Sequence, residues 1–93
     1  MSNQKYIIRC DRAGVFYAEI ESREGSEAVL RNARRVYYWT GAATLSQLAQ
    51  DGVGSESKLT VTVPSMTVLG VIEVIPVSEA AAKKLDSVRE WRA

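Results

Sequence analysis

Short β-favouring runs separated by turn residues are the feature that most limits what this chain can fold into. Residues 5–10 form one such run, and the turn residues 11–14 follow it. Residues 15–21 form a second run in which side chains alternate, with Phe16 on an apolar face and Tyr17 on a face expected to meet water. This alternation predicts half-buried strands of an antiparallel sheet.

A second tight turn at Gly25 leads into a third strand that begins near Glu27. Three strands joined in this way predict an antiparallel meander. The pair Asn32-Ala33 interrupts the third strand before another β-favouring run at residues 35–39. From the sequence alone this interruption can be a bend, a bulge or a short turn.

Two short helices are predicted from capping signals. Thr44 with Gln47 three residues later is a capping-box pattern, and Gly52 is suited to end the helix. Ser78 is expected to cap a second helix. The apolar stripe of that second helix is predicted to contain Ala81, Ala82, Leu85, Val88 and Trp91.

Two more strands are predicted between these helices. Residues 58–63 alternate as a half-buried strand, and Pro64-Ser65 separates them from residues 66–75, which are apolar on both faces and so predict a central strand. The expected fold is α+β: a small antiparallel β-meander or barrel-like sheet of about five to six strands with two short helices. A single domain is expected to span residues 1–93.

Composition and charge exclude several kinds of function. Twelve basic residues face eleven acidic ones, for a net charge of +1, so the overall charge favours neither a membrane partner nor a specific nucleic-acid partner. No histidine is present, which removes the usual zinc sites and the commonest general base. Glu19 and Glu21 are expected on a solvated face. We therefore expect no enzyme, no catalytic residue, no metal and no cofactor.

Cysteine usage and the first residues indicate the expected compartment. Cys10 is the single cysteine and is expected in the core, which fits a reducing, cytosol-like setting. Residues 1–5 are polar, so no secretory signal is expected.

One segment, residues 32–52, carries residues typical of binding surfaces. Arginine and aromatic side chains are enriched at binding hot spots, and a helix start beside arginines can bind an anion or phosphate. Between residues 28 and 50 no acidic residue occurs. The candidate ligand-binding residues are Asn32, Arg34, Arg35, Tyr37, Tyr38, Trp39, Thr44, Ser46 and Gln47.

Simpler roles explain the same residues. Tyrosine and tryptophan in a strand often pack in the core, Thr44 and Gln47 can serve only as helix caps, and the arginines can form surface ion pairs. Three functions compete: capture of a small anionic ligand of nucleotide type, docking on another protein, and weak nucleic-acid binding through Arg31 to Arg35. A pocket shared between the subunits of a homo-oligomer is also compatible with the segment.

The sequence also resembles a family of small tailed-bacteriophage proteins of unknown function. The resemblance covers most of the chain and rests on AGVF at residues 13–16, ESREG at 21–25, NARR at 32–35, Tyr38-Trp39, Gly41-Ala42, LSQLA at 45–49 and VIEVIP at 71–76. It implies a phage or prophage origin and a location in the host cytoplasm. With that origin, the anionic ligand could be a nucleotide-type host defence signal, and the protein-docking alternative includes a virion-associated role. The resemblance implies no activity and no site residue.

Overall fold

A computed structural model describes residues 4–93 of the protein and contains six strands and two helices. Three strands come first, followed by a helix, three further strands and a final helix. In chain order the elements are β1 (Tyr6–Cys10), β2 (Gly14–Glu24), β3 (Glu27–Tyr38), α1 (Leu45–Asp51), β4 (Lys58–Leu59), β5 (Val63–Val68), β6 (Val71–Pro76) and α2 (Glu79–Ser87).

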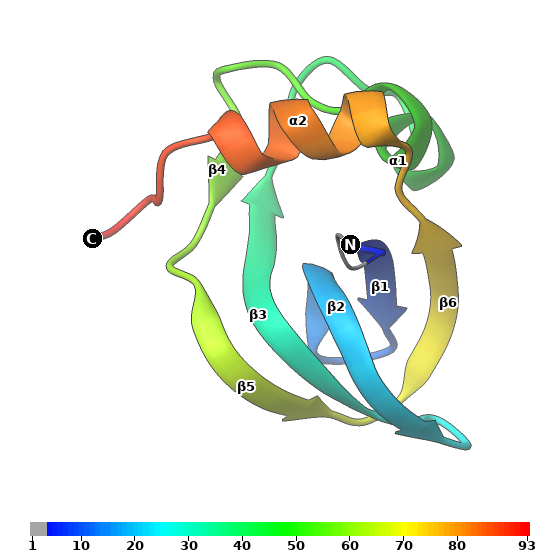
Figure 1. Ribbon diagram of the computed structural model, residues 1–93. Helices are drawn as coiled ribbons and strands as arrows, with labels where there is room; N and C mark the ends of the chain where they lie inside the picture. Colours follow the sequence, from blue (N-terminus) through cyan, green and yellow to red (C-terminus); the bar gives the residue numbers. More distant parts are fainter. Residues whose placement is uncertain (1–3) are drawn as a thin grey trace.

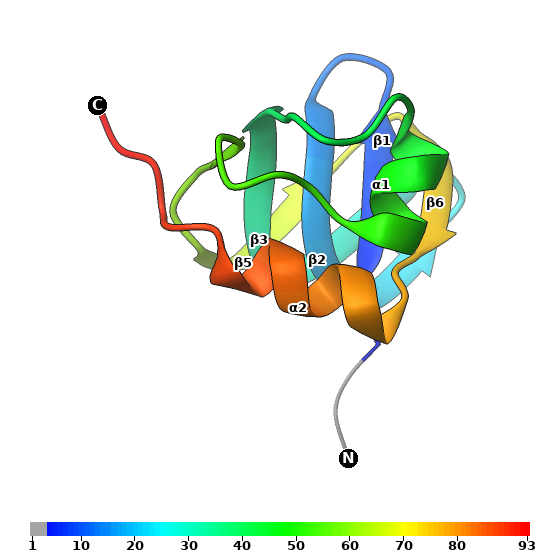
Figure 2. The ribbon, with the colours of Figure 1, turned by 90° about the horizontal axis from the view of Figure 1, so that it is seen from above.

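The six strands form one antiparallel sheet in the order β4-β3-β2-β1-β6, and β5 pairs with β3 beside this path. Strands β1, β2 and β3 form the predicted meander. The sheet is strongly curved, and α1 and α2 lie together at one end of it (Figure 1), where α2 crosses over the strands when seen from above (Figure 2). The predicted α+β class is confirmed. The sheet is nevertheless open, with β6 at one end of the strand order, so a barrel-like closure is not confirmed.

β3 continues through the position where the sequence shows an interruption. Tyr17 of β2 lies opposite Arg34 and Glu19 lies opposite Arg31, so β3 advances three residues where β2 advances two. Asn32 has a φ of 51°, a left-handed conformation that asparagine adopts more readily than most residues. The interruption is therefore a β-bulge within one strand.

The predicted extents of the later strands are wrong. β4 ends at Leu59 and β5 begins only at Val63. Pro64 lies inside β5 rather than between strands, which is tolerated because β5 pairs with β3 on one side only. The predicted central strand at residues 66–75 is in fact parts of two strands at the margins of the sheet, β5 and β6. Gly70, with a φ of 74°, turns the chain between them.

The predicted helix caps are confirmed. The Thr44 hydroxyl accepts a hydrogen bond from the Gln47 amide at 3.2 Å, and the Gln47 side chain accepts one from the Ala43 amide at 2.9 Å. Gly52 ends α1 with a φ of 87°. The Ser78 hydroxyl caps α2 by accepting from the Ala81 amide at 3.1 Å. Each of these contacts spans a few residues, which explains why the local sequence predicts them.

Val88 packs against the same hydrophobic core as Ala81 and Leu85, as the predicted stripe expects. The predicted continuation of this stripe to Trp91 is wrong, because α2 ends at Ser87. The chain then turns back along β4, and the Trp91 amide donates to the Leu59 carbonyl at 2.9 Å. The Trp91 ring stacks on Tyr37, with 4.8 Å between ring centroids. Trp91 therefore packs against the sheet and not along α2.

Two hydrophobic cores lie on opposite faces of the sheet, because neighbouring residues of one strand such as Phe16 and Tyr17 belong to different cores. The expectation that Tyr17 meets water is wrong: its side chain is fully covered on the helix side. The helix-side core contains Ile7, Tyr17, Val36, Leu48, Ala49, Val53, Leu59, Val77, Ala81 and Leu85. The strand-side core contains Ile8, Cys10, Phe16, Ala18, Ala28, Leu30, Ala33, Val68 and Val71.

Candidate functional site

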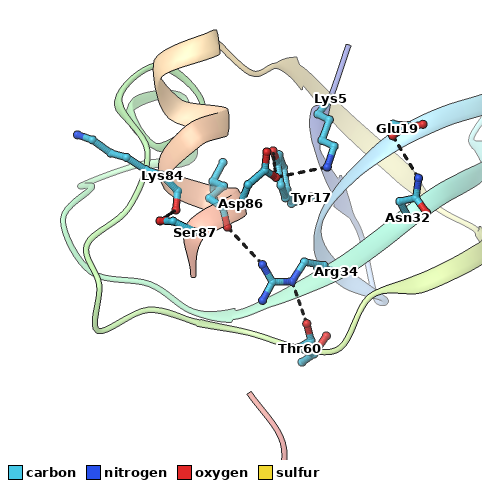
Figure 3. Close-up of polar contacts among 10 residues, drawn as sticks. Lys5, Tyr17, Glu19, Asn32, Arg34, Thr60, Lys84, Asp86 and Ser87 are labelled. Carbon is cyan, nitrogen blue, oxygen red and sulfur yellow. Dashed lines mark hydrogen bonds and ion pairs between the residues drawn. The ribbon is translucent and has the colours of Figure 1, made fainter. Parts of the chain in front are cut away.

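Arg34 joins β3 to α2 and to the segment after β4. Its guanidinium donates three hydrogen bonds, all to backbone carbonyls: to Thr60 at 3.0 Å, to Leu85 at 3.2 Å and to Leu59 at 3.1 Å. Figure 3 shows the side chain reaching from its strand toward α2 and Thr60. Only 7% of Arg34 is exposed. This predicted ligand-binding residue thus binds the protein's own backbone.

The buried guanidinium also changes the electrostatics at the end of α2. Burial lowers the pKa of Arg34, and the nearby carboxylates of Glu90 and Asp86 oppose this shift. The C-terminal end of a helix carries partial negative charge on its unpaired carbonyls. Arg34 binds one of these carbonyls, and the Ser87 hydroxyl donates to another, that of Lys84, at 2.7 Å. The positive charge of the Arg34 guanidinium therefore offsets the partial negative charge at the C-terminal end of α2.

Tyr17 and Asp86 form a second polar contact under α2. The Tyr17 hydroxyl donates to the Asp86 carboxylate at 2.8 Å, and the Lys5 ammonium reaches the same oxygen at 3.3 Å (Figure 3). Burial raises the pKa of Tyr17 strongly, and the hydrogen bond to Asp86 adds to the rise. The phenol is thus held neutral, and this contact anchors α2 to the sheet.

Arg35 points to the face opposite Arg34. Its guanidinium lies over the Phe16 ring, 4.7 Å from the centroid, and it donates to the carbonyl of Ala13. Arg34 and Arg35 therefore do not share one site, and Arg31 forms an exposed ion pair with Glu21 at 3.0 Å. The three arginines consequently do not form one basic surface.

The predicted aromatic residues do not lie together in one site either. Tyr37 and Tyr38 are exposed, at 61% and 50%, whereas Trp39 packs against the helix-side core and donates its indole N–H to the Ala42 carbonyl at 3.1 Å. Asn32 lies earlier in β3 and donates to the Glu19 carboxylate at 3.2 Å (Figure 3). Tyr37 stacks on Trp91, which is not among the predicted ligand-binding residues.

The start of α1 is occupied by its own caps. Thr44, Ser46 and Gln47 are exposed, and α1 has only seven residues. The turn before α1 contains Gly41, which lets another segment of backbone approach closely. That space is filled by the chain itself: a Cβ on Gly41 would lie 2.8 Å from the amide nitrogen of Gly54.

A cleft of about 670 Å³ lies between residues 53–58 and the stretch from Lys84 to Trp91. We call it the tail cleft. In Figure 1 the end of α2 and the C-terminal segment pass beside β4. Three cationic side chains and one carboxylate line it, together with an indole ring: Lys58, Lys84, Arg89, Glu90 and Trp91.

Local contacts position these side chains. A Cβ on Gly52 would lie 2.9 Å from the Cβ and Cδ of Lys84, so glycine at this position lets the Lys84 stem lie against the end of α1. The Lys58 ammonium lies 5.2 Å from the centroid of the Trp91 ring. The Glu90 carboxylate accepts from the Thr62 amide at 3.0 Å, and this bond, as the largest cause, lowers its pKa.

Sequence reasoning missed the three cationic residues of the tail cleft and assigned Trp91 to α2. The only signal near them is the pair Lys83-Lys84 with Arg89, Trp91 and Arg92 close behind. Nothing in that pattern indicates that residues 53–58 face it. The cleft exists only because the C-terminal segment pairs back on Leu59.

In residues 4–93 no three histidine, cysteine or acidic side chains gather as metal ligands would. Over the same residues, no helix has the length and apolarity to span a membrane. Burial raises the pKa of the Cys10 thiol, opposed by Arg35, so the thiol is held in its less reactive protonated form.

Together, the open six-stranded sheet, the two helices and the cationic cleft define a small α+β protein. The family model described as a domain of unknown function (DUF6948) matches residues 3–85. The chain belongs to this family. The match ends before Arg89, Glu90 and Trp91, so three of the five charged and aromatic residues of the tail cleft lie outside the matched residues. No curated protein and no solved structure gives a significant match.

Proposed function

We propose that this protein binds a small anionic ligand of nucleotide type in the tail cleft and performs no chemistry on it. The observation that carries the proposal is the convergence of Lys58, Lys84 and Arg89 on a cleft that also contains Trp91. A cleft of this volume lies within the usual range of small-molecule sites, roughly 300 to 1,000 Å³.

The charge of the cleft favours an anion. Three cationic side chains face one carboxylate, and that carboxylate is already bound to the Thr62 amide and to Arg92. Arg34 adds a buried positive charge under the neighbouring helix end. Phosphate oxygens suit lysine and arginine donors, because charge-assisted hydrogen bonds are shorter and stronger than neutral ones.

The aromatic residues favour a ligand with a planar group. Trp91 belongs to the cleft and Tyr37 stacks on it. A base beside the indole could replace Lys58 over the ring and leave that ammonium free for phosphate. Stacking of a base on an aromatic side chain contributes roughly 1–3 kcal/mol.

The resemblance to phage proteins adds to the proposal a place where the protein acts. In the cytoplasm of an infected host, a phage protein that holds a nucleotide-type defence signal would need affinity and no turnover. This agrees with a cleft that has cationic and aromatic residues but no histidine.

Thermal-shift and calorimetric titration with cyclic and linear nucleotides test the proposal. A ligand at one hundred times its Kd stabilises the folded state by about 2.7 kcal/mol. Lys84→Gln and Lys58→Gln should weaken binding at least tenfold. Lys83→Gln is the matched control, since Lys83 is the next residue on α2 and does not line the cleft. The proposal fails if millimolar nucleotides leave the melting temperature unchanged.

Docking on a host or phage protein is a second candidate, supported by the exposure of Tyr37 and Tyr38 at the end of β3. Exposed tyrosines are typical binding hot spots. Here Tyr38→Ala should remove a captured partner from infected-cell lysate, while nucleotide titrations stay flat. Recovery of the same partners by the wild type and this variant would exclude Tyr38 as a docking residue.

A further inference from the structure

We propose that a second copy of this chain docks at the end of the sheet opposite the helices, in a groove beside the β5–β6 turn, and forms a weak two-fold dimer. The groove has a volume of about 600 Å³ and lies between residues 11–13 and 66–70. In Figure 1 the β5–β6 connection runs along the bottom of the sheet, away from α1 and α2. This site is therefore separate from the tail cleft.

The floor of the groove is apolar and its rim is charged. Phe16, Met66 and Val68 line the groove. Phe16 and Val68 are buried in the strand-side core beneath it, so the partly exposed Met66 is the part of this floor that a partner can reach. Asp11, Arg12 and Arg35 line it as well. Such a site fits a partner that brings an aliphatic side chain next to a carboxylate, because the arginines can pair with the carboxylate while the aliphatic group covers the floor.

The rim of the groove itself carries an aliphatic side chain next to a carboxylate. Leu69 is 65% exposed at the β5–β6 turn, and Asp11 contacts this turn at Gly70, where the Asp11 amide donates to the Gly70 carbonyl at 2.8 Å. Leu69 and Asp11 thus form an apolar group beside a carboxylate, next to a groove with an apolar floor and two arginines. A surface that carries both halves of a complementary pair can bind its own copy across a two-fold axis.

The turn that carries Leu69 is held from both sides. Besides the Asp11 contact, the amide of Val71 donates to the Ser26 carbonyl in the β2–β3 turn at 2.9 Å. Arg35 is held as well, through its contacts with Phe16 and Ala13. Little ordering is therefore needed on association, which favours binding by a small surface.

The number of residues that form the groove sets the expected affinity of the dimer. A stable interface usually involves about 20–30 residues on each side. The groove is formed by far fewer, so the dimer should dissociate on dilution and form in the micromolar to millimolar range.

Sedimentation velocity over that concentration range tests the proposal. The wild type should shift from monomer toward dimer as concentration rises, and added salt should weaken the shift because Asp11 pairs with arginines. Leu69→Asp should remain monomeric throughout. Tyr38→Asp is the matched control: Tyr38 is also an exposed large hydrophobic residue, but it lies outside the groove, and its variant should dimerise like the wild type.

Backbone amide NMR spectra recorded on dilution provide a second measurement that needs no variant. The shifts that change should belong to residues 11–13 and 66–70. A wild type that stays monomeric at millimolar concentration overturns the proposal. So does a Leu69→Asp variant that associates normally, or a set of changing shifts that lies elsewhere.

Discussion

Replacing Arg34 with methionine removes three hydrogen bonds from a buried guanidinium while keeping much of its volume. Hydrogen bonds to charged groups contribute roughly 1.5–3 kcal/mol each, so the simple sum is large. Two of the three carbonyls keep a backbone donor, however: Leu59 accepts from Trp91 at 2.9 Å and Leu85 accepts from Val88 at 3.3 Å. The cost is therefore smaller than the sum, and we expect a loss of about 2–4 kcal/mol in the free energy of unfolding.

Such a loss is a large share of the stability of a domain this size, which is roughly 5–14 kcal/mol. Urea unfolding followed by circular dichroism should show a lower midpoint with an unchanged slope. Arg31→Met is the control: Arg31 is an exposed arginine on the same strand, and its removal should change stability by about 0.5 kcal/mol or less. Equal midpoints for the two variants would refute the structural role given to Arg34.

Three further predictions follow from single residues. The pKa of Tyr17 is raised above its unfolded value of 10.0, so the unfolded chain releases this proton first as the pH rises. The free energy of unfolding should therefore fall above about pH 10. In urea titrations Tyr17→Phe should flatten that decline. Cys10, whose thiol pKa is raised, should react with a thiol reagent only after unfolding, and a fast native reaction would contradict its burial. Gly41→Ala should cost roughly 2–4 kcal/mol in calorimetry, through a φ of 83° and the close Gly54 backbone. Gly25→Ala, with a positive φ but open space around it, should cost less.

The predictions that the structure confirms depend on neighbouring residues. The caps at Thr44 and Ser78 each involve a hydrogen bond to a residue three positions along the chain. The turn at Gly25 requires a positive φ, which is 59° in the structure. Alternation and tight turns were likewise enough to predict the meander of β1, β2 and β3.

The candidate site could be predicted far less well, because its parts are distant in the chain. Arg34 and Arg35 are neighbours with the same chemistry, and strand geometry alone sends them to opposite faces. The packing of α2 and of residues 59–60 decides that Arg34 is buried, since its carbonyl partners lie 25 to 51 residues away.

The tail cleft shows the same limit. Lys58 and Trp91 come together because the segment after α2 turns back onto β4, and no local pattern specifies that turn. The sequence by itself therefore determined the first three strands, their tight turns and the helix caps, through hydrogen bonds and side-chain periodicity within a few residues. The tertiary structure alone decided which charged and aromatic side chains became structural and which were left facing a cleft, because burial and charge pairing depend on residues far apart in the chain.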